Sequence, residues 1–194
     1  QQPRQQPAAA AAMDVLLRQQ QQRQVSRHLA AAAAAKALGI SGDAVAAGLS
    51  TFTGAGRRFE HKGNYNGAEV YDDYAHHPGE LHALLTTAKS LGYRRIICAF
   101  QPHTYSRTKA LFDEFVEELK LPDIAVLMEI FAARETDTLG ISSKDLADAI
   151  PGAIYCKTLD DVTATLRSLA QEGDLILTVG AGDIYLAGEK LLVK

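Results

Sequence analysis

The sequence predicts an α/β fold, a three-layer, Rossmann-like domain with a mostly parallel sheet, because strand-like apolar runs alternate with helix-like segments along most of it. Arg95–Gln101 contains five consecutive apolar residues, which is typical of a strand covered on both faces. Ser106–Leu119 instead spaces its large apolar residues as one helical stripe. Strands that alternate with helices imply right-handed parallel crossovers. We also expect one antiparallel strand at Arg57–Lys62 and a helical segment before the sheet.

The first part of the chain has a different composition from the rest. The opening residues are rich in Gln, Ala and Pro, so we expect a low-complexity tail there. The run Ala30–Ala35 strongly favours a helix, and Gly39 is a suitable helix end. Ser41 can then cap a second short helix. The expected divisions are a tail at 1–24, a helical segment at 25–53 and an α/β domain at 54–194.

The α/β domain is expected to begin with a hairpin. The β-like runs Arg57–Lys62 and Ala68–Tyr74 enclose Gly63-Asn64-Tyr65-Asn66-Gly67, which predicts a loop longer than the tightest type. Pro78 can then open a helix that continues through Glu80–Leu91.

The alternation continues to the end of the sequence. A long loop is expected between the next strand and Gly140, with Ser142 or Ser143 as the following helix cap. The remaining strands are expected at Ile124–Ile130, Ala153–Cys156 and Leu175–Val179, and the remaining helices at 143–150, Leu159–Gln171 and Ile184–Leu192.

Composition excludes several classes of function. The 194 residues have room for one domain, and 47% of them are hydrophobic, which suffices for a proper core. A net charge of -3 gives no general basic footprint for nucleic acid. No apolar run approaches the roughly 18 residues of a membrane helix, so we expect no membrane insertion. Cys98 and Cys156 fall inside expected strands and form no C-x-x-C pair, which favours buried thiols and a cytoplasmic location.

Two polar motifs each follow an expected strand and precede an expected helix. The first is Asp72-Asp73-Tyr74-Ala75-His76-His77-Pro78, and the second is Gln101-Pro102-His103-Thr104-Tyr105-Ser106-Arg107. Turns of this kind meet at the carboxyl edge of an open parallel sheet, where ligands bind. We therefore expect the two motifs to form one polar site for a charged ligand.

Each candidate residue also has a structural interpretation. The His76-His77 pair beside a helix start suits an anion, and no third His or Cys stands at a spacing that would indicate zinc. Arg107 offers a bidentate fork for a carboxylate or phosphate, although it could simply be a surface residue of a first helical turn. Asp72 and Asp73 could form the turn, and Tyr105 could pack.

Two further segments could bind an anion. Arg57-Arg58 could clamp a phosphate or could be a solvated pair beside a buried Phe59. Gly180-Ala181-Gly182 could bring backbone N–H groups to an anion, but it lacks the third Gly of a dinucleotide fingerprint. The sequence contains neither a P-loop nor a G-x-S-x-G nucleophile elbow. The two strand-end motifs and these two segments therefore predict part of a polar site, but the sequence contains no motif that would hold a triphosphate.

Four motifs together resemble the bacterial Mur ligases. The matching segments are Gly56–Glu60, Tyr71–Pro78 with Glu80, Phe100–Thr108 and Gly180–Ile184. They stand in the family's order over roughly residues 50–194, and the resemblance is strongest to the branch that joins L-alanine to UDP-N-acetylmuramate. It implies the C-terminal domain of such a ligase, preceded by the last helices of the central domain.

The resemblance implies roles for individual residues. It places His76, His103 and Arg107 as catalytic groups, with Tyr74 and Tyr105 added around the substrates. It places Arg57, Asp73 and Glu80 near the nucleotide, and it assigns no metal ligand to this chain. ATP and Mg²⁺ would be bound mainly by the missing central domain, so we expect the chain to be inactive without the N-terminal and central domains.

The sequence departs from the family pattern in three ways, one of which is that the family's P-loop and UDP-binding N-terminal domain are missing from it. Thr104 stands where the family usually has Arg, which removes one cation from the amino-acid pocket. Arg27-His28-Leu29 only superficially resembles the family's adenine-binding His-Asn motif. Two alternatives stay open. One is a ligase that attaches whole peptides to the same sugar nucleotide, which the stretch Tyr71–Pro78 fits nearly as well, and the other is a non-catalytic binding module, for which Thr104 is the reason.

Overall fold

The computed structural model describes residues 29–50 and 56–193, and the chain divides into two compact units at Gly56 and Arg57. The expected tail at 1–24 lies outside the described residues. The expected divisions at 25–53 and 54–194 lie close to this boundary, but most of the link between them is not described.

The first unit contains a helical hairpin, as expected. Residues 29–37 form one helix, and α2 (Gly42–Ser50) forms the second. Gly39 has φ +76°, and the N–H groups of Gly39 and Ile40 donate to the carbonyls of Lys36 and Ala35, an arrangement that closes a helix with glycine just beyond its end. Ser41 Oγ accepts from the Ala44 N–H at 3.3 Å and so caps α2.

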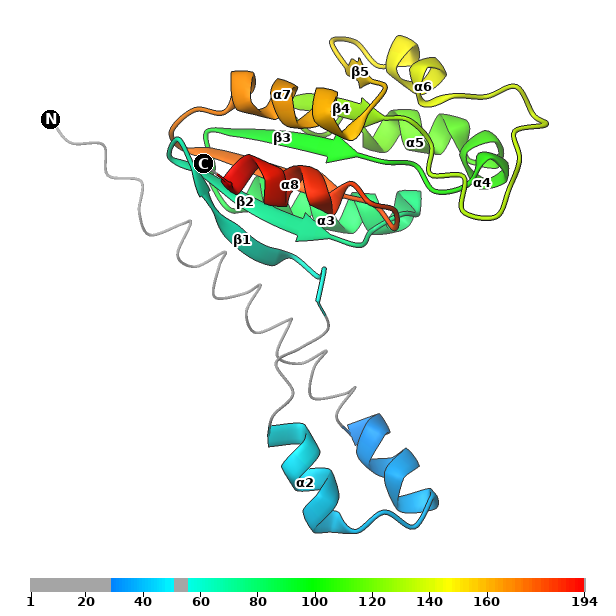
Figure 1. Ribbon diagram of the computed structural model, residues 1–194, viewed down its shortest axis with the longest axis vertical. Coiled ribbons are helices and arrows are strands. Elements are labelled where there is room, and N and C mark those ends of the chain that lie inside the picture. The colour runs from blue at the N-terminus through cyan, green and yellow to red at the C-terminus, as the bar shows by residue number, and fades with distance from the viewer. Residues whose placement is uncertain (1–28, 51–55, 194) are drawn as a thin grey trace, which may run out of the picture. The chain divides into compact units, whose positions relative to one another are not determined.

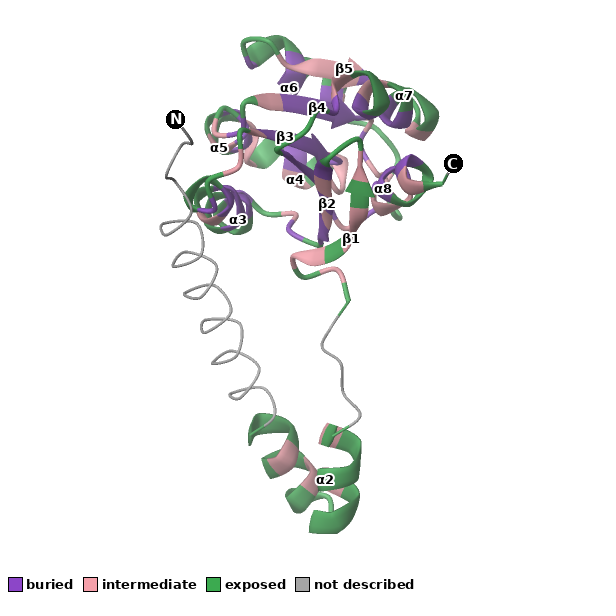
Figure 2. Cartoon of the chain, turned by 90° about the vertical axis from the view of Figure 1, so that its left-hand side faces the viewer, coloured by how far each residue is buried: buried purple, intermediate pink, exposed green. Residues whose placement is uncertain are grey.

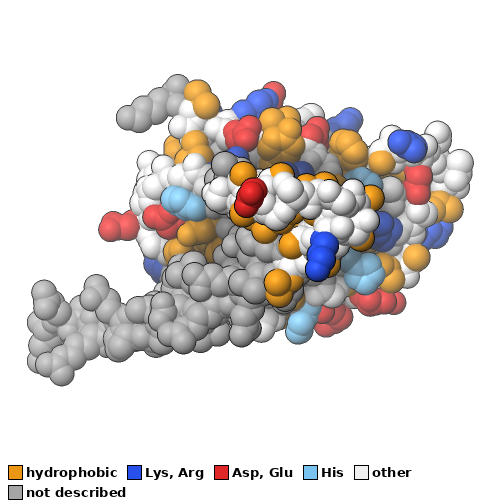
Figure 3. All heavy atoms as spheres, turned by 90° about the horizontal axis from the view of Figure 1, so that it is seen from below, with side chains coloured by type: hydrophobic (Ala, Val, Ile, Leu, Met, Phe, Trp, Pro, Cys, Tyr) orange, Lys and Arg blue, Asp and Glu red, His pale blue; other side chains and the backbone are white. Residues whose placement is uncertain are grey.

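The hairpin exposes its apolar side chains. None of the residues of α2 is buried (Figure 2). In the turn before it, Leu38 is 80% exposed. Lys36 and Asp43 are the only charged residues between positions 29 and 50, so the hairpin surface is almost uncharged (Figure 3). A single helix pair of this kind cannot bury an apolar face by itself.

The second unit is a six-stranded sheet in the order β1-β2-β6-β3-β4-β5, parallel throughout except for the β1–β2 pair (Figure 1). This arrangement confirms the expected fold class. The strands are β1 (Glu60–Tyr65), β2 (Ala68–Asp73), β3 (Arg95–Phe100), β4 (Ile124–Met128), β5 (Ile154–Cys156) and β6 (Asp174–Val179).

Helices cover both faces of the sheet and make two separate cores. On one face lie α3 (Pro78–Ser90), α4 (Tyr105–Ala110), α5 (Phe112–Glu118) and α6 (Ser143–Ala149), and on the other lie α7 (Leu159–Leu169) and α8 (Tyr185–Leu192). Neighbouring strand residues alternate between the cores: Cys98 and Phe100 face α3 and α5, whereas Ile97 and Ala99 face α7 and α8. All six residues of β6 are buried, because that strand lies in the middle of the sheet.

The structure corrects the expected hairpin. The antiparallel strand begins at Glu60, because Arg57 and Phe59 have φ +58° and +47° and form a bend. The predicted long loop is wrong, since only Asn66 and Gly67 connect β1 to β2. Both have positive φ (+51° and +78°), as a tight two-residue hairpin turn requires.

The predicted helix Ser106–Leu119 is also interrupted. Leu111 has φ −115° and ψ 27°, which ends α4 and starts α5. The stripe of apolar residues is real, since Phe115 and Leu119 are buried in the α3-side core, but it belongs to α5 alone.

Candidate active site at the carboxyl edge of the sheet

The carboxyl ends of the central strands bring three loops together. Because β6 lies between β2 and β3, the two polar motifs are not direct neighbours: Gly180–Ile184, which follows β6, lies between them. The loop after β4 comes next in the sheet order, beyond β3. The expectation that the two motifs share one edge is confirmed, with a glycine loop as the floor between them.

Arg57 holds the glycine loop in place. Its Nε donates to Asp72 Oδ2 at 2.7 Å, and its Nη atoms donate to the carbonyls of Gly180 (2.6 Å) and Gly182 (3.1 Å). Its guanidinium also lies 4.6 Å from the ring centre of Tyr185 and 5.1 Å from that of Tyr74. Arg57 was predicted to contact a phosphate. In the structure, its guanidinium donates to a carboxylate and to carbonyl groups of the chain itself.

The glycines of this loop are required by packing. Gln101 lies beneath them: its Nε2 donates to Asp183 Oδ1 at 2.9 Å, and its Oε1 accepts from the Ile184 N–H. A Cβ on Gly180 would lie 2.6 Å from the Gln101 carbonyl oxygen, and one on Gly182 would lie 2.8 Å from the ring of Phe131. The packing interpretation of the Gly-rich turn thus accounts for both glycines.

Asp73 is a turn-forming residue at the end of β2. Its carboxylate accepts from the N–H groups of Ala75 (2.8 Å) and Phe59 (2.7 Å), and it is 9% exposed. Burial raises the pKa of Asp73 above its ordinary value, although these two hydrogen bonds oppose the shift. Asp73 was predicted to lie near the nucleotide, and both of its carboxylate oxygens accept hydrogen bonds from backbone N–H groups of the chain itself.

The first motif presents His76 at the edge. Its Nδ1 lies 2.9 Å from the Tyr74 carbonyl, which can only accept, so Nδ1 carries a proton. The His76 ring meets the Tyr74 ring edge-on at 5.4 Å. His77 caps α3 instead, accepting from the Gly79 N–H, so the two adjacent histidines have different roles.

Glu80 supports this turn from the first turn of α3. Its Oε2 accepts from the backbone N–H groups of His76 (2.9 Å) and His77 (3.3 Å), which completes a capping box. Burial acts to raise the pKa of Glu80, but these hydrogen bonds and the nearby His76 ring hold it below its ordinary value. Glu80 was predicted near the nucleotide, and the structure places it as a support of the His76 backbone.

The second motif presents His103 and Arg107. The His103 ring centre lies 6.0 Å from that of His76, so the two motifs do converge. Burial, Arg107 and His76 lower the pKa of His103 below its ordinary value, and Glu135 acts in the opposite direction. The imidazole is therefore neutral near pH 7. Arg107 lies half-buried on α4, 3.5 Å from the His103 carbonyl.

Thr104 has an unusual backbone conformation. Its φ of +73° and ψ of 141° lie in a region that β-branched residues rarely adopt. Its N–H donates to the Phe131 carbonyl at 2.9 Å, and its carbonyl accepts from the N–H and Oγ1 of Thr108. The surrounding hydrogen bonds thus hold a strained residue between His103 and Tyr105, which is typical of functional sites.

The sequence analysis missed the loop after β4. Phe131 pairs with His103 through an isolated parallel bridge and stacks on its ring at 5.6 Å with a 22° interplanar angle. Glu135 accepts from the Ser106 N–H and Oγ at the start of α4. The strand-end rule that identified the first two motifs applies equally to β4, and it could have identified this loop too.

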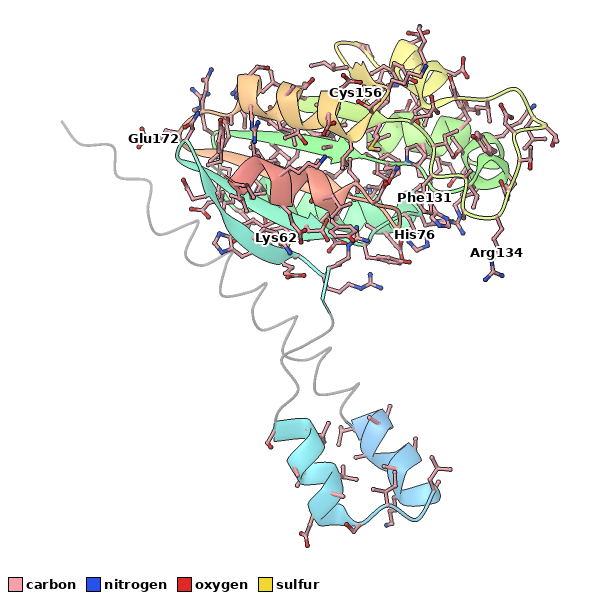
Figure 4. The ribbon with its side chains drawn as sticks, in the orientation of Figure 1. Lys62, His76, Phe131, Arg134, Cys156 and Glu172 are labelled. Carbon is pink, nitrogen blue, oxygen red and sulfur yellow. The ribbon has the colours of Figure 1, made fainter. Side chains whose placement is uncertain are left out.

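Figure 4 shows how these side chains lie. His76 and Phe131 occupy the same end of the sheet, whereas Glu172 marks the opposite end and Arg134 projects away from the body. Tyr105, predicted as a substrate contact, begins α4 and is half-buried. The predicted residues Tyr74, His76, His103 and Arg107 therefore line one edge, while Arg57, Asp73 and Glu80 support it.

The described residues, 29–50 and 56–193, contain no group of three or more His, Cys, Asp or Glu side chains able to hold a metal ion. Within the same ranges, no helix is long and apolar enough to cross a membrane. Cys98 is fully buried, and burial raises the pKa of its thiol to about 12. None of these features adds a metal or a nucleophilic cysteine to the carboxyl edge.

Curated relatives identify the sequence family in which this arrangement occurs. The chain is 49% identical over 161 residues to the UDP-N-acetylmuramate–L-alanine ligase of Lachnospira eligens. This match covers 81% of this chain and 35% of the relative. It is 48% identical over 162 residues to the ligase of the same name from Clostridium novyi, with the same coverage. The chain thus spans about a third of the length of these relatives.

Solved structures and a family model agree with this assignment. The UDP-N-acetylmuramate–alanine ligase of Thermotoga maritima matches 87% of this chain and 36% of its own, with a TM-score of 0.60 and 28% identity. A murein peptide ligase from Psychrobacter arcticus also matches 87% of this chain and 36% of its own, with a TM-score of 0.64 and 27% identity. The family model described as "Mur ligase, glutamate ligase domain" matches residues 57–182. The chain therefore belongs to the Mur ligase family, and its α/β unit is the glutamate ligase domain of that family.

Proposed function

We propose that this chain supplies the C-terminal domain of an ATP-dependent ligase that joins L-alanine to UDP-N-acetylmuramate in peptidoglycan synthesis. The observation that supports it best is the convergence of His76, His103 and Arg107 from two separate strand ends onto one edge. The names of the relatives that are 48–49% identical point to the same reaction.

The residues at the edge suit an amino acid and an acyl group. Arg107 offers a fork for the carboxylate of the incoming amino acid. A neutral His103 can accept a hydrogen bond, or a proton, from the amine that must attack as a free base. His76 donates its Nδ1 proton to the Tyr74 carbonyl and can direct its other nitrogen at a ligand. Tyr74 and Tyr105 flank these groups as substrate contacts.

We propose that the nucleotide is held mainly by a domain outside this chain. Arg57, Asp73 and Glu80 are the residues predicted near it, and all three are engaged with the chain's own carbonyl or N–H groups. ATP and Mg²⁺, once bound, supply the phosphate that activates the carboxylate. We infer that the almost uncharged helical hairpin at 29–50 belongs to the central domain and packs against its remainder.

Phosphate release tests this proposal. With ATP, UDP-N-acetylmuramate and L-alanine, we expect no turnover by the chain alone and turnover after separately expressed N-terminal and central domains of a relative are added. Arg107→Lys should then raise the KM for L-alanine, because Lys cannot offer a bidentate fork. Robust turnover by the 194-residue chain alone would refute the dependence on the other domains.

A related peptide ligase is the second candidate, favoured by the TM-score of 0.64 to the murein peptide ligase. In the reconstituted system, L-alanine and a tripeptide compete directly for the acyl group. Preference for the tripeptide would select this candidate, and preference for L-alanine would exclude it.

A further inference from the structure

Phe131, on the loop after β4, contacts the loops after β3 and β6. Its N–H donates to the Pro102 carbonyl at 2.8 Å, and its carbonyl accepts from the Thr104 N–H, so its backbone brackets His103 on both sides. Its ring stacks on the His103 ring, and a side chain on Gly182 would collide with it. Phe131 thus lies between the floor of the site and His103.

The orientation of the His103 ring needs such a support because one of its two nitrogens, Nδ1, is buried without a partner among the described residues. The ring is flanked by Phe131 and His76, and no other ring contact to it is found among the described side chains. Its orientation therefore depends on packing and on the fixed backbone at Thr104.

We propose that Phe131 is a positioning residue that fixes the orientation of the His103 ring. This proposal rests on the proposed function for its catalytic consequence but not for its structural part. The flat ring excludes water from one face of the imidazole and sets its plane toward His76. The charged and titratable groups that face His103 are Arg107 on α4, His76 on the loop after β2 and Glu135 on the loop after β4.

The structural part is tested on the 194-residue chain by NMR titration of the His103 ring, assigned through the loss of its signals in His103→Gln. Phe131→Ala should raise the pKa of His103 toward the ordinary value of about 6.5, because water then reaches the ring. Phe131→Tyr keeps a flat ring and should leave the titration unchanged. Phe112→Ala is the matched control, because Phe112 is also half-buried, on α5, and packs against the α3-side core.

The outcomes decide between positioning and general packing. A raised pKa in Phe131→Ala, with both other variants unchanged, supports the proposal. An unchanged His103 titration in a folded Phe131→Ala chain overturns it, as does an equal shift in Phe112→Ala. Should Phe131→Ala not fold, Phe131→Leu replaces it, since Leu keeps part of the packing but leaves uncovered part of the imidazole face that the aromatic ring covers. A smaller rise in the pKa of His103 then supports the proposal, and an unchanged titration overturns it.

The catalytic consequence is tested separately in the reconstituted ligase. Phe131→Ala should lower kcat by up to about 100-fold, the scale of a misplaced reacting group, while the KM for L-alanine changes little. Phe131→Tyr should restore kcat. If the reconstituted ligase does not use L-alanine at all, the proposed function fails while the NMR result still stands. If the ligase works and Phe131→Ala leaves kcat unchanged, the positioning role fails alone.

Discussion

The two ends of the sheet differ in how completely their buried polar side chains are hydrogen-bonded. At the amino end, the fully buried Asp174 accepts from Arg95 Nη2 (2.6 Å) and Nε (3.1 Å), from Arg94 Nε (3.3 Å) and from the Gln171 N–H (3.0 Å). At the carboxyl end lie the two buried side-chain atoms that lack a partner in the described part of the chain, His103 Nδ1 and Ser143 Oγ. Buried polar groups are normally satisfied. This difference agrees with the proposal that the carboxyl end binds a ligand, whereas the paired groups at the amino end stabilise the fold.

The largest loss of stability is expected from adding a side chain to the glycine loop that follows β6. Gly180→Ala would place a Cβ 2.6 Å from the Gln101 backbone oxygen, at a residue with φ +145°. Because a backbone atom cannot rotate away, we expect a loss of about 3 kcal/mol in the free energy of unfolding, measured by urea denaturation. Gly140→Ala is the control, since it also has positive φ but nothing within 4 Å, and it should cost only about 1 kcal/mol. Equal losses would show that backbone strain alone accounts for the effect.

The next effect is expected at the amino end. Asp174→Asn removes charge-assisted hydrogen bonds to Arg95 and Arg94, so we expect a loss of about 2–3 kcal/mol. Ligand contacts at the opposite end should be unaffected. Asp123→Asn is a useful comparison, since that carboxylate accepts from the Ile96 N–H without an arginine in its hydrogen bonds. A changed His103 titration in Asp174→Asn would contradict the separation of the two ends.

The hydrogen bonds of Asp174 should also make the stability of the chain depend on pH. Burial acts to raise the pKa of Asp174, but the hydrogen bonds from Arg95, Gln171 and Arg94 hold it below its ordinary value. The unfolded chain then binds the proton more readily, so this part of the stability is present above about pH 4 and is lost as pH falls through the lowered pKa. The wild-type chain should therefore lose more stability between pH 5 and 2 than Asp174→Asn does, as measured by urea midpoints; parallel curves would contradict this assignment.

The smallest effect on stability is expected at Thr104, a residue of the carboxyl end that we expect to affect activity more than the fold. Thr104→Gly relieves a strained φ of +73° but makes the unfolded chain more flexible, so the two effects nearly cancel, within about 1 kcal/mol. The His103 backbone becomes less constrained, so the ligase reconstituted with this variant should lose activity while its thermal midpoint stays unchanged. A clear loss of stability instead would mean that Thr104 serves the fold.

The alternation of elements could be predicted because apolar periodicity depends on which face each residue buries. The continuous apolar run of β3 and the stripe of α3 lie where the sequence placed them. The interruption at Leu111 could not be predicted, because the residue itself is a good helix former and the break depends on tertiary packing. The tight turn at Asn66-Gly67 was predictable in retrospect, since Asn-Gly is the strongest short hairpin signal.

The candidate site was predicted only in part. The strand-end rule brought His76 and His103 together, which the 6.0 Å between their rings confirms. The partners of Arg57 could not be inferred, since the carbonyls of Gly180 and Gly182 are more than 120 residues away and depend on β6 entering between β2 and β3. Phe131 was missed because an aromatic residue after a strand reads as ordinary core.

The central place of β6 also has a consequence for the order of folding. This strand is the last in the sequence, yet it joins the β1–β2 hairpin to the β3–β4–β5 half of the sheet. During synthesis, the two halves can form locally but cannot pair until Asp174–Val179 has emerged from the ribosome. Contacts of such long sequence separation slow folding and leave open strand edges exposed in the meantime. We therefore expect the junction between the loops after β2 and β3 to assemble last, together with the whole sheet.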